Sequence, residues 1–443
     1  MKAVTASALR RLVFLLSLLA AGSALANPDI QHWTAETGAR VYFVPVDALP
    51  MLDVRIDFDA GSARDPDGQA GLAALARGLL ESGTAELDEQ AIAEAIADTG
   101  ARFGGGLDGD RAWFSVRTLS SAAERDAAIA LAAQLIAQPE YPTDVLEREK
   151  SRSRAALREA LTRPAVLAER RFEERLFAGH PYGQQISLES IDAIGRDALR
   201  DFHRRHYAAN NASITIVGDA SRAEAERIAL TLTRELPTLQ SALPAIPEPA
   251  PTRHQIERIA NPSAQAHLLA GLPGMSRQDP DYYPLLVGNH ILGGSGLVSR
   301  LSQEVREKRG FAYSVYSYFM PRAVPGPFQI GLQTRGAQVD DAQELVRSVL
   351  ADFIDQGPSE EELKAAKDNL INGFGLRLDA NSKILDWVAM IGFYELPLDW
   401  LDAYTEHVAA VSLEDIREAF QRRVRPEQLI VVIAGGDGDE QKP

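Results

Sequence analysis

Apolar and polar residues alternate along some segments of the chain and follow other spacings elsewhere. Residues 54–61 (VRIDFDAG) alternate strictly, which is the pattern of a strand with one buried face. Residues 143–161 predict a helix, and the short apolar segments 214–217 (ITIV) and 429–434 (LIVVIA) predict buried strands. The pattern therefore predicts strands and helices in mixed order along the chain.

One predicted helix is interrupted in an unusual way. Residues 71–84 (GLAALARGLLESGT) place their leucines at the three- and four-residue spacing of one helix face. Arg77 and Gly78 stand in the middle of this segment, a long cation beside the poorest helix former after proline. The pattern alone does not explain why a buried helix would carry that pair.

The chain also repeats itself. Three blocks of similar sequence occur in the same order in both halves, at offsets of 214, 216 and 218 residues. The residues that correspond are Asp65, Pro142 and Phe202 in the first half and Asp279, Pro358 and Phe420 in the second. A nearly constant offset indicates a duplicated unit of roughly 215 residues. The predicted fold is therefore α+β, a tandem duplication of two homologous α/β-sandwich domains.

A proline-rich segment separates the two copies. Residues 236–253 (LPTLQSALPAIPEPAPTR) contain five prolines and show no periodicity, which predicts an extended linker. The predicted domains are accordingly residues 27–235 and residues 254–443.

The first 26 residues have the composition of a secretory signal peptide. Lys2, Arg10 and Arg11 precede the apolar run 12–22, and residues 24–26 (ALA) supply small side chains at the cleavage spacing. No other stretch approaches the ~18 consecutive apolar residues that a membrane helix needs. We therefore expect signal cleavage, no membrane span afterwards, and a periplasmic or secreted mature protein.

Charge and cysteine content exclude several function classes. The formal net charge is −16, and removing the three signal-peptide cations makes it −19 (−16 − 3), which argues against nucleic acid as a partner. The chain has no cysteine, so disulfides, thiolate catalysis and cysteine-bound zinc are excluded. The charge does not indicate which peptide or protein might bind.

No complete catalytic set is visible. None of the eight histidines lies in a His-Glu-x-x-His or His-x-x-Glu-His frame, and no serine elbow or phosphate loop is present. His203 and His206 are three residues apart, but two arginines separate them and no acidic third ligand follows. We expect both to be polar residues on an exposed helix face.

The duplicated halves and the interrupted helix together resemble the pitrilysin, insulinase and mitochondrial-processing-peptidase family, the inverzincins. Members have a clam-shell peptidase architecture and carry the segment Gly-Leu-Ala-His-x-x-Glu-His-x-x-x-x-Gly-Thr, in which both histidines bind zinc and the glutamate is the general base. The present sequence matches that frame at Gly71, Leu72, Ala73, Gly83 and Thr84. The resemblance covers almost the whole mature chain.

The residues that would perform the chemistry are replaced. Ala74, Arg77 and Gly78 stand where the first ligand, the base and the second ligand would be, while Glu147 matches the position of the third ligand. A single carboxylate holds zinc weakly, so the resemblance implies a degenerate site without metal in this chain. Arg77 either pairs with Glu147 across the empty site or faces solvent.

The second half keeps a pair that the family uses near the scissile bond. Arg306 and Tyr313 are seven residues apart, across the end of a helix that Arg309-Gly310 should terminate. A guanidinium can hold a substrate carbonyl, and a phenol can donate to a developing oxyanion. The resemblance therefore implies that this pair supports catalysis on a partner chain.

In bacterial members the zinc frame and this pair can be divided between two chains. The resemblance implies that this chain is the non-catalytic subunit of a heterodimer, inactive alone, whose His-x-x-Glu-His partner carries the zinc and cleaves unfolded peptides. Such peptides add as a strand to a sheet edge, here expected near residues 104–117. Two alternatives remain: a structural scaffold subunit, and a stand-alone periplasmic peptide-binding protein.

Overall fold

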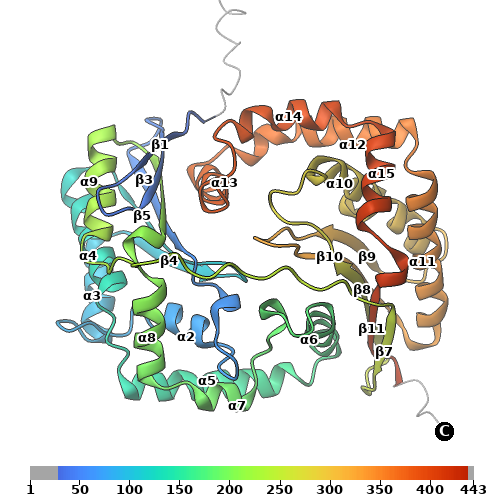
Figure 1. Cartoon of the computed structure of the whole chain (residues 1–443), viewed down its shortest axis with the longest axis horizontal. Coiled ribbons are helices and arrows are strands. Elements are labelled where there is room, and N and C mark those ends of the chain that lie inside the picture. The colour runs from blue at the N-terminus through green and yellow to red at the C-terminus, as the bar shows by residue number, and fades with distance from the viewer. Residues whose placement is uncertain (1–27, 438–443) are drawn as a thin grey trace, which may run out of the picture.

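The computed structural model describes residues 28–437, which form two sheets with helices packed around them (Figure 1). The signal peptide predicted for residues 1–26 lies outside these residues. The strands are β1 (Gln31–Thr34), β2 (Arg40–Pro45), β3 (Met51–Phe58), β4 (Arg102–Leu107), β5 (Ala112–Leu119), β6 (Ala212–Gly218), β7 (Gln255–Ile259), β8 (Gln265–Pro273), β9 (Ser314–Phe319), β10 (Pro327–Arg335) and β11 (Ile430–Gly435). The helices of the first half are α2 (Leu72–Gly78), α3 (Glu89–Thr99), α4 (Ala122–Ala137), α5 (Thr143–Ala160), α6 (Pro164–Leu176), α7 (Leu188–Ala193), α8 (Arg196–His206) and α9 (Arg222–Thr233). Those of the second half are α10 (Tyr282–Asn289), α11 (Val339–Gln356), α12 (Glu360–Asn372), α13 (Asn381–Phe393), α14 (Trp400–Ala410) and α15 (Leu413–Arg423).

The two sheets share their topology over five strands, and β1 is an additional strand at one edge of the first sheet. The first has the order β1-β2-β6-β3-β5-β4 and the second the order β7-β11-β8-β10-β9, so β2, β6, β3, β5 and β4 correspond to β7, β11, β8, β10 and β9. The parallel pair β2–β6 is matched by β7–β11, and the remaining pairs in this correspondence are antiparallel in both sheets. The predicted duplication of an α/β sandwich is confirmed.

Each half covers a sheet of the other half with one helix. Helix α6 of the first half packs on β8 and β11, and α13 of the second half packs on β2, β3 and β6 (Figure 1). Both contacts are close, because a Cβ added to Gly271 would lie 2.9 Å from the ring of Phe172, and one added to Gly392 would lie 2.6 Å from the ring of Tyr42. This reciprocal packing joins the halves through a shared core.

The alternation seen in residues 54–61 separates two faces of β3. Val54, Ile56 and Phe58 are fully buried against the helices of the first half. On the opposite face Arg55 donates to both carboxylate oxygens of Asp57, at 2.9 and 2.7 Å. Helix α13 covers this polar face, so the charges are buried and satisfied by pairing within the protein.

A second buried carboxylate fastens the halves at the turn between β4 and β5. Asp110 accepts from the hydroxyl of Tyr182 in the first half. From the second half it accepts from the hydroxyl of Tyr394 at 2.8 Å and from the backbone N–H of Ala323 at 2.9 Å. The carboxylate is almost inaccessible to solvent, so these donors replace its hydration.

The proline-rich segment runs between α9 and β7 without helix or strand. It is held to the body of the protein, because Arg64 donates to the carbonyl of Pro244 at 2.6 Å and the His180 imidazole donates to that of Pro247 at 2.7 Å. None of the helices within residues 28–437 combines the length and apolar character that crossing a bilayer requires.

The expectation for His203 and His206 was wrong. Both imidazoles are buried on α8, where His203 donates to the carbonyl of Ile136 at 2.7 Å and His206 to that of Asp59 at 3.1 Å. Burial lowers the pKa of each to about 4. They are neutral core residues because they lie on the same face of α8 as the buried Leu199 and Phe202.

Candidate functional site

The site of the interrupted helix is built on α2. The carboxylate of Asp65 accepts from the backbone N–H groups of Gly71 and Ala73, both at 2.7 Å, and so fixes the start of the helix. Leu72, Ala73 and Ala76 face the core, whereas Ala74 and Gly78 are exposed. Ala74 and Gly78, which stand where the family has its two histidine ligands, therefore share one solvent-facing side of a short helix whose start is fixed by Asp65.

Arg77 neither pairs with Glu147 nor faces solvent, the two environments expected from the sequence. Its Nε donates to the carbonyl of Trp113 at 2.6 Å and its Nη2 to that of Gly104 at 2.8 Å. The guanidinium lies 5.0 Å from the ring centroid of Phe114, and a weaker ion pair reaches Glu81 at 3.7 Å. Neither the pairing with Glu147 nor the solvent-facing alternative is correct, because Arg77 is buried and joins α2 to the β4–β5 hairpin.

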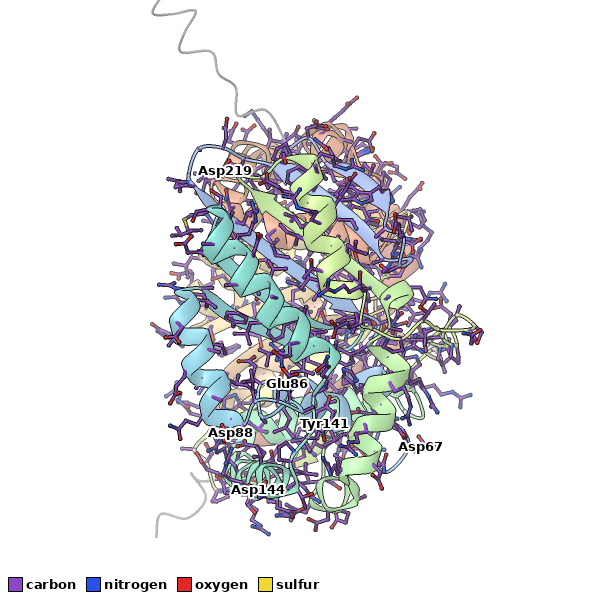
Figure 2. All side chains as sticks on the ribbon, turned by 90° about the vertical axis from the view of Figure 1, so that its left-hand side faces the viewer. Asp67, Glu86, Asp88, Tyr141, Asp144 and Asp219 are labelled. Carbon is purple, nitrogen blue, oxygen red and sulfur yellow. The ribbon has the colours of Figure 1, made fainter. Side chains whose placement is uncertain are left out.

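Two buried tyrosines lie beside Arg77. Tyr141, just before Asp144 of α5 (Figure 2), is buried with a φ of 49° and donates its hydroxyl to the carbonyl of Ala76 at 3.2 Å. Burial raises the pKa of Tyr141 and of Tyr207, while the nearby positive charge of Arg77 opposes that shift. Both phenols stay protonated, so this side of α2 holds a fixed cation among neutral groups.

A cavity of about 230 Å³ opens on the exposed side of α2, between α2, α5 and the region of α7. Ala74 and Gly78 form one wall, and Glu149 and Ser153 of α5 face them. Glu147 is not part of this lining: its side chain is 55% exposed and pairs with Lys150 at 3.3 Å. The carboxylate at the cavity is that of Glu149, which differs from Glu147 by two residues and hence by about 200° around the helix.

These residues do not fit a zinc ion. Zinc in this family needs two imidazoles and a carboxylate, but Ala74 and Gly78 have no ligand atoms and Arg77 brings a positive charge. Glu149 is already engaged, since it accepts from Arg152 at 2.9 and 3.0 Å. Within residues 28–437 no cluster of three or more histidine, cysteine, aspartate or glutamate side chains is placed to hold a metal.

The pair in the second half is brought together. The guanidinium carbon of Arg306, in the π-helical segment Ser302–Glu307, lies 5.4 Å from the ring centroid of Tyr313. Tyr313 immediately precedes β9 and is 85% exposed, and Gly310 (φ 63°) makes the turn between the two residues. The side chain of Arg306 is half-buried, 29% exposed, and lies 3.6 Å from Glu307, whereas the phenol of Tyr313 faces solvent.

The segment before this pair differs in part from its helical prediction. Leu301 and Val305 are buried as a helical stripe requires, but the preceding Leu297 is 63% exposed, in a short turn of 3-10 helix after Gly296. The left-handed φ of 66° at Gly296 accounts for the break.

Comparison with known proteins assigns the chain to a family. The model described as "Insulinase (Peptidase family M16)" matches residues 50–189, and the one described as "Peptidase M16 inactive domain" matches residues 193–370. A solved structure from Pseudomonas fluorescens, described as a peptidase M16 inactive domain, is 37% identical, with a TM-score of 0.87 over 92% of this chain and 97% of that one. The chain belongs to peptidase family M16.

Two curated M16 relatives show the range of activities assigned to similar chains. The "Non-peptidase homolog YmxG" of Helicobacter pylori is 25% identical over 87% of this chain and 89% of that protein. An uncharacterized zinc protease of Streptomyces coelicolor is 29% identical, and the match spans 56% of this chain but only 55% of that protein. Together with the replaced zinc ligands, the match to inactive-type relatives makes this chain a non-catalytic homologue of the M16 zinc proteases.

Proposed function

We propose that this chain is the non-catalytic subunit of a secreted M16 zinc metallopeptidase and positions peptide in the active site of a His-x-x-Glu-His partner. The observation that carries the proposal is the contrast between its two sites. The zinc positions hold Ala74, Arg77 and Gly78, whereas the half-buried Arg306 still lies against the exposed ring of Tyr313. An inactive chain has no use of its own for this Arg/Tyr pair, but a partner's active site does.

The division of labour follows from the chemistry of each group. Zinc bound to the partner would supply the activated water. The guanidinium of Arg306 would hold a carbonyl of the peptide, and the phenol of Tyr313 would donate to the oxyanion that develops at the scissile bond. Removing one such donor typically slows turnover by about 10²–10³-fold.

Peptide would be captured by strand addition. Strand β4 (RFGGGL) lies at the end of the first sheet, with β5 on one side and, within the described residues, no further strand of that sheet on the other. Hydrogen bonds to the main chain of such an edge do not depend on side chains, so the substrate would be any unfolded peptide with suitable flanking residues.

The test is a peptidase assay on an unstructured peptide, with this chain, with a His-x-x-Glu-His homologue from the same organism, and with both. We expect no turnover by this chain alone and a large gain over the homologue alone when both are present. Tyr313→Phe should remove most of that gain, whereas Tyr316→Phe, the same change at a neighbouring exposed tyrosine of β9, should not.

The alternatives give different results. If the two chains form a stable complex but Tyr313→Phe leaves its turnover unchanged, the chain is a scaffold subunit. If the chain remains a monomer in sedimentation experiments and still binds extended peptides, it is a stand-alone peptide-binding protein of the periplasm.

A further inference from the structure

The cavity at the replaced zinc positions has its own chemistry. Its walls include five aliphatic side chains, those of Leu75, Leu79, Ile186, Ile191 and Ile194. Leu79, Ile191 and Ile194 are buried, whereas Ile186 is 38% exposed and leaves part of the apolar wall in contact with water. An apolar wall that is left uncovered gains free energy from any apolar group that covers it.

The polar groups of the cavity do not select a charged ligand. Glu149 is held by both of its oxygens to the guanidinium of Arg152, so its negative charge is compensated at the rim. Ser153 adds one hydroxyl, and the rest of the lining is aliphatic, alanine or glycine. The cavity therefore favours a neutral, apolar occupant.

Size limits that occupant to one side chain. The volume is about 230 Å³, whereas an apolar cavity of about 150 Å³ holds a benzene molecule. Pockets for whole drug-sized ligands begin at about 300 Å³. Access is free, because a Cβ added to Gly78 would meet nothing within 4 Å.

We propose that this cavity is a subsite for one aliphatic side chain, leucine, isoleucine or methionine, of the bound peptide. The inference rests on the proposed peptide-positioning function and adds a preference for aliphatic residues to it. Two residues of its wall, Ala74 and Gly78, stand on either side of Arg77 in the sequence of α2, and Arg77 binds the carbonyl of Gly104 on edge strand β4, so the same helix borders the cavity and contacts the peptide edge.

The test uses two labelled, unstructured peptides of glycine, serine and asparagine that differ at one central position, leucine in one and serine in the other. Their affinities for the full mature chain are measured by fluorescence anisotropy. We expect the leucine peptide to bind about tenfold more tightly, in line with partial burial of one leucine side chain. Ala74→Leu should fill the cavity and remove the preference. Ala93→Leu, the same change at an exposed position of α3, should retain it.

Each outcome decides between the proposals. Equal affinity for the two peptides overturns the subsite while leaving peptide positioning intact, and so does a preference that persists in the folded Ala74→Leu variant. If neither peptide binds to the chain alone or to its complex with the partner, both proposals fail. A circular dichroism melt of each variant establishes that it is folded before binding is compared.

Discussion

The guanidinium of Arg77 occupies the space in which residue 105 would carry a side chain. A Cβ added to Gly105 would lie 1.9 Å from Nη2 of Arg77 and 2.2 Å from the carbonyl oxygen of Trp113. Glycine is required at this position by Arg77, by the Trp113 carbonyl and by its own φ of 155°. The residue in the position of the family's general base is a structural link between helix and sheet.

The first prediction concerns that fit. Gly105→Ala should lower the free energy of unfolding by about 1–3 kcal/mol, because the added methyl group must displace either Arg77 or the backbone of β5 and the φ of 155° is unfavourable for alanine. Gly104→Ala is the control, since its Cβ would meet only the Ser115 hydroxyl at 3.2 Å. Urea denaturation of the two variants measures the difference. If both variants lose the same free energy of unfolding, the close contact between residue 105 and Arg77 does not contribute to the cost.

The second prediction concerns Arg77→Met, which removes the hydrogen-bond donors of the guanidinium and keeps an unbranched apolar side chain in its place. In Arg77→Met the carbonyls of Gly104 and Trp113 lose their donors, at an expected cost of about 2–4 kcal/mol in the free energy of unfolding. Arg205→Met, on the exposed side of α8, should change stability by less than ~0.5 kcal/mol. A loss for Arg77→Met no larger than for Arg205→Met would mean that water replaces the guanidinium without cost.

The duplication was predictable from sequence because the segments that form corresponding parts of the two halves have similar sequences. Blocks around Asp65 and Asp279, and the closing strands 214–217 and 429–434, recur in order, and the two sheets share the order of five strands. The reciprocal packing of α6 and α13 was not predictable, since periodicity shows that a helix has an apolar face but not which sheet covers it.

The candidate site was predicted in part. The positions of Ala74, Arg77 and Gly78 follow from a motif frame, but the partners of Arg77 are backbone carbonyls 27 and 36 residues away, which no side-chain pattern reveals. Helical register could have indicated Glu149. It lies four residues before Ser153, so these two share one side of α5, whereas Glu147 points away from it.

The third prediction addresses the junction of the halves at Asp110. Asp110→Ala leaves the hydroxyls of Tyr182 and Tyr394 and the N–H of Ala323 without their acceptor, which should cost about 3–5 kcal/mol. Because two of these donors belong to the second half, thermal unfolding should broaden or separate into two transitions in calorimetry. Asp98→Ala, on the exposed side of α3, is the control and should melt like the wild type. A single, unshifted transition for Asp110→Ala would show that α6 and α13 alone hold the halves together.

The last prediction is the acid sensitivity that follows from the two buried histidines. Burial lowers the pKa of His203 and His206 from 6.5 to about 4, and for His206 the positive charges of Arg64 and Arg205 add to that effect. Since the unfolded chain binds protons first, the stability present above pH 6.5 is lost as the pH falls from 6.5 to 4, by up to about 3 kcal/mol for each histidine. The double variant His203→Gln/His206→Gln should lose less stability than the wild type between pH 7 and pH 4.5 in urea denaturation, whereas His407→Gln, at an exposed position of α14, should follow the wild type. Carboxylates titrate alike in all three proteins, so an identical pH dependence in the double variant would show that these imidazoles are protonated without unfolding.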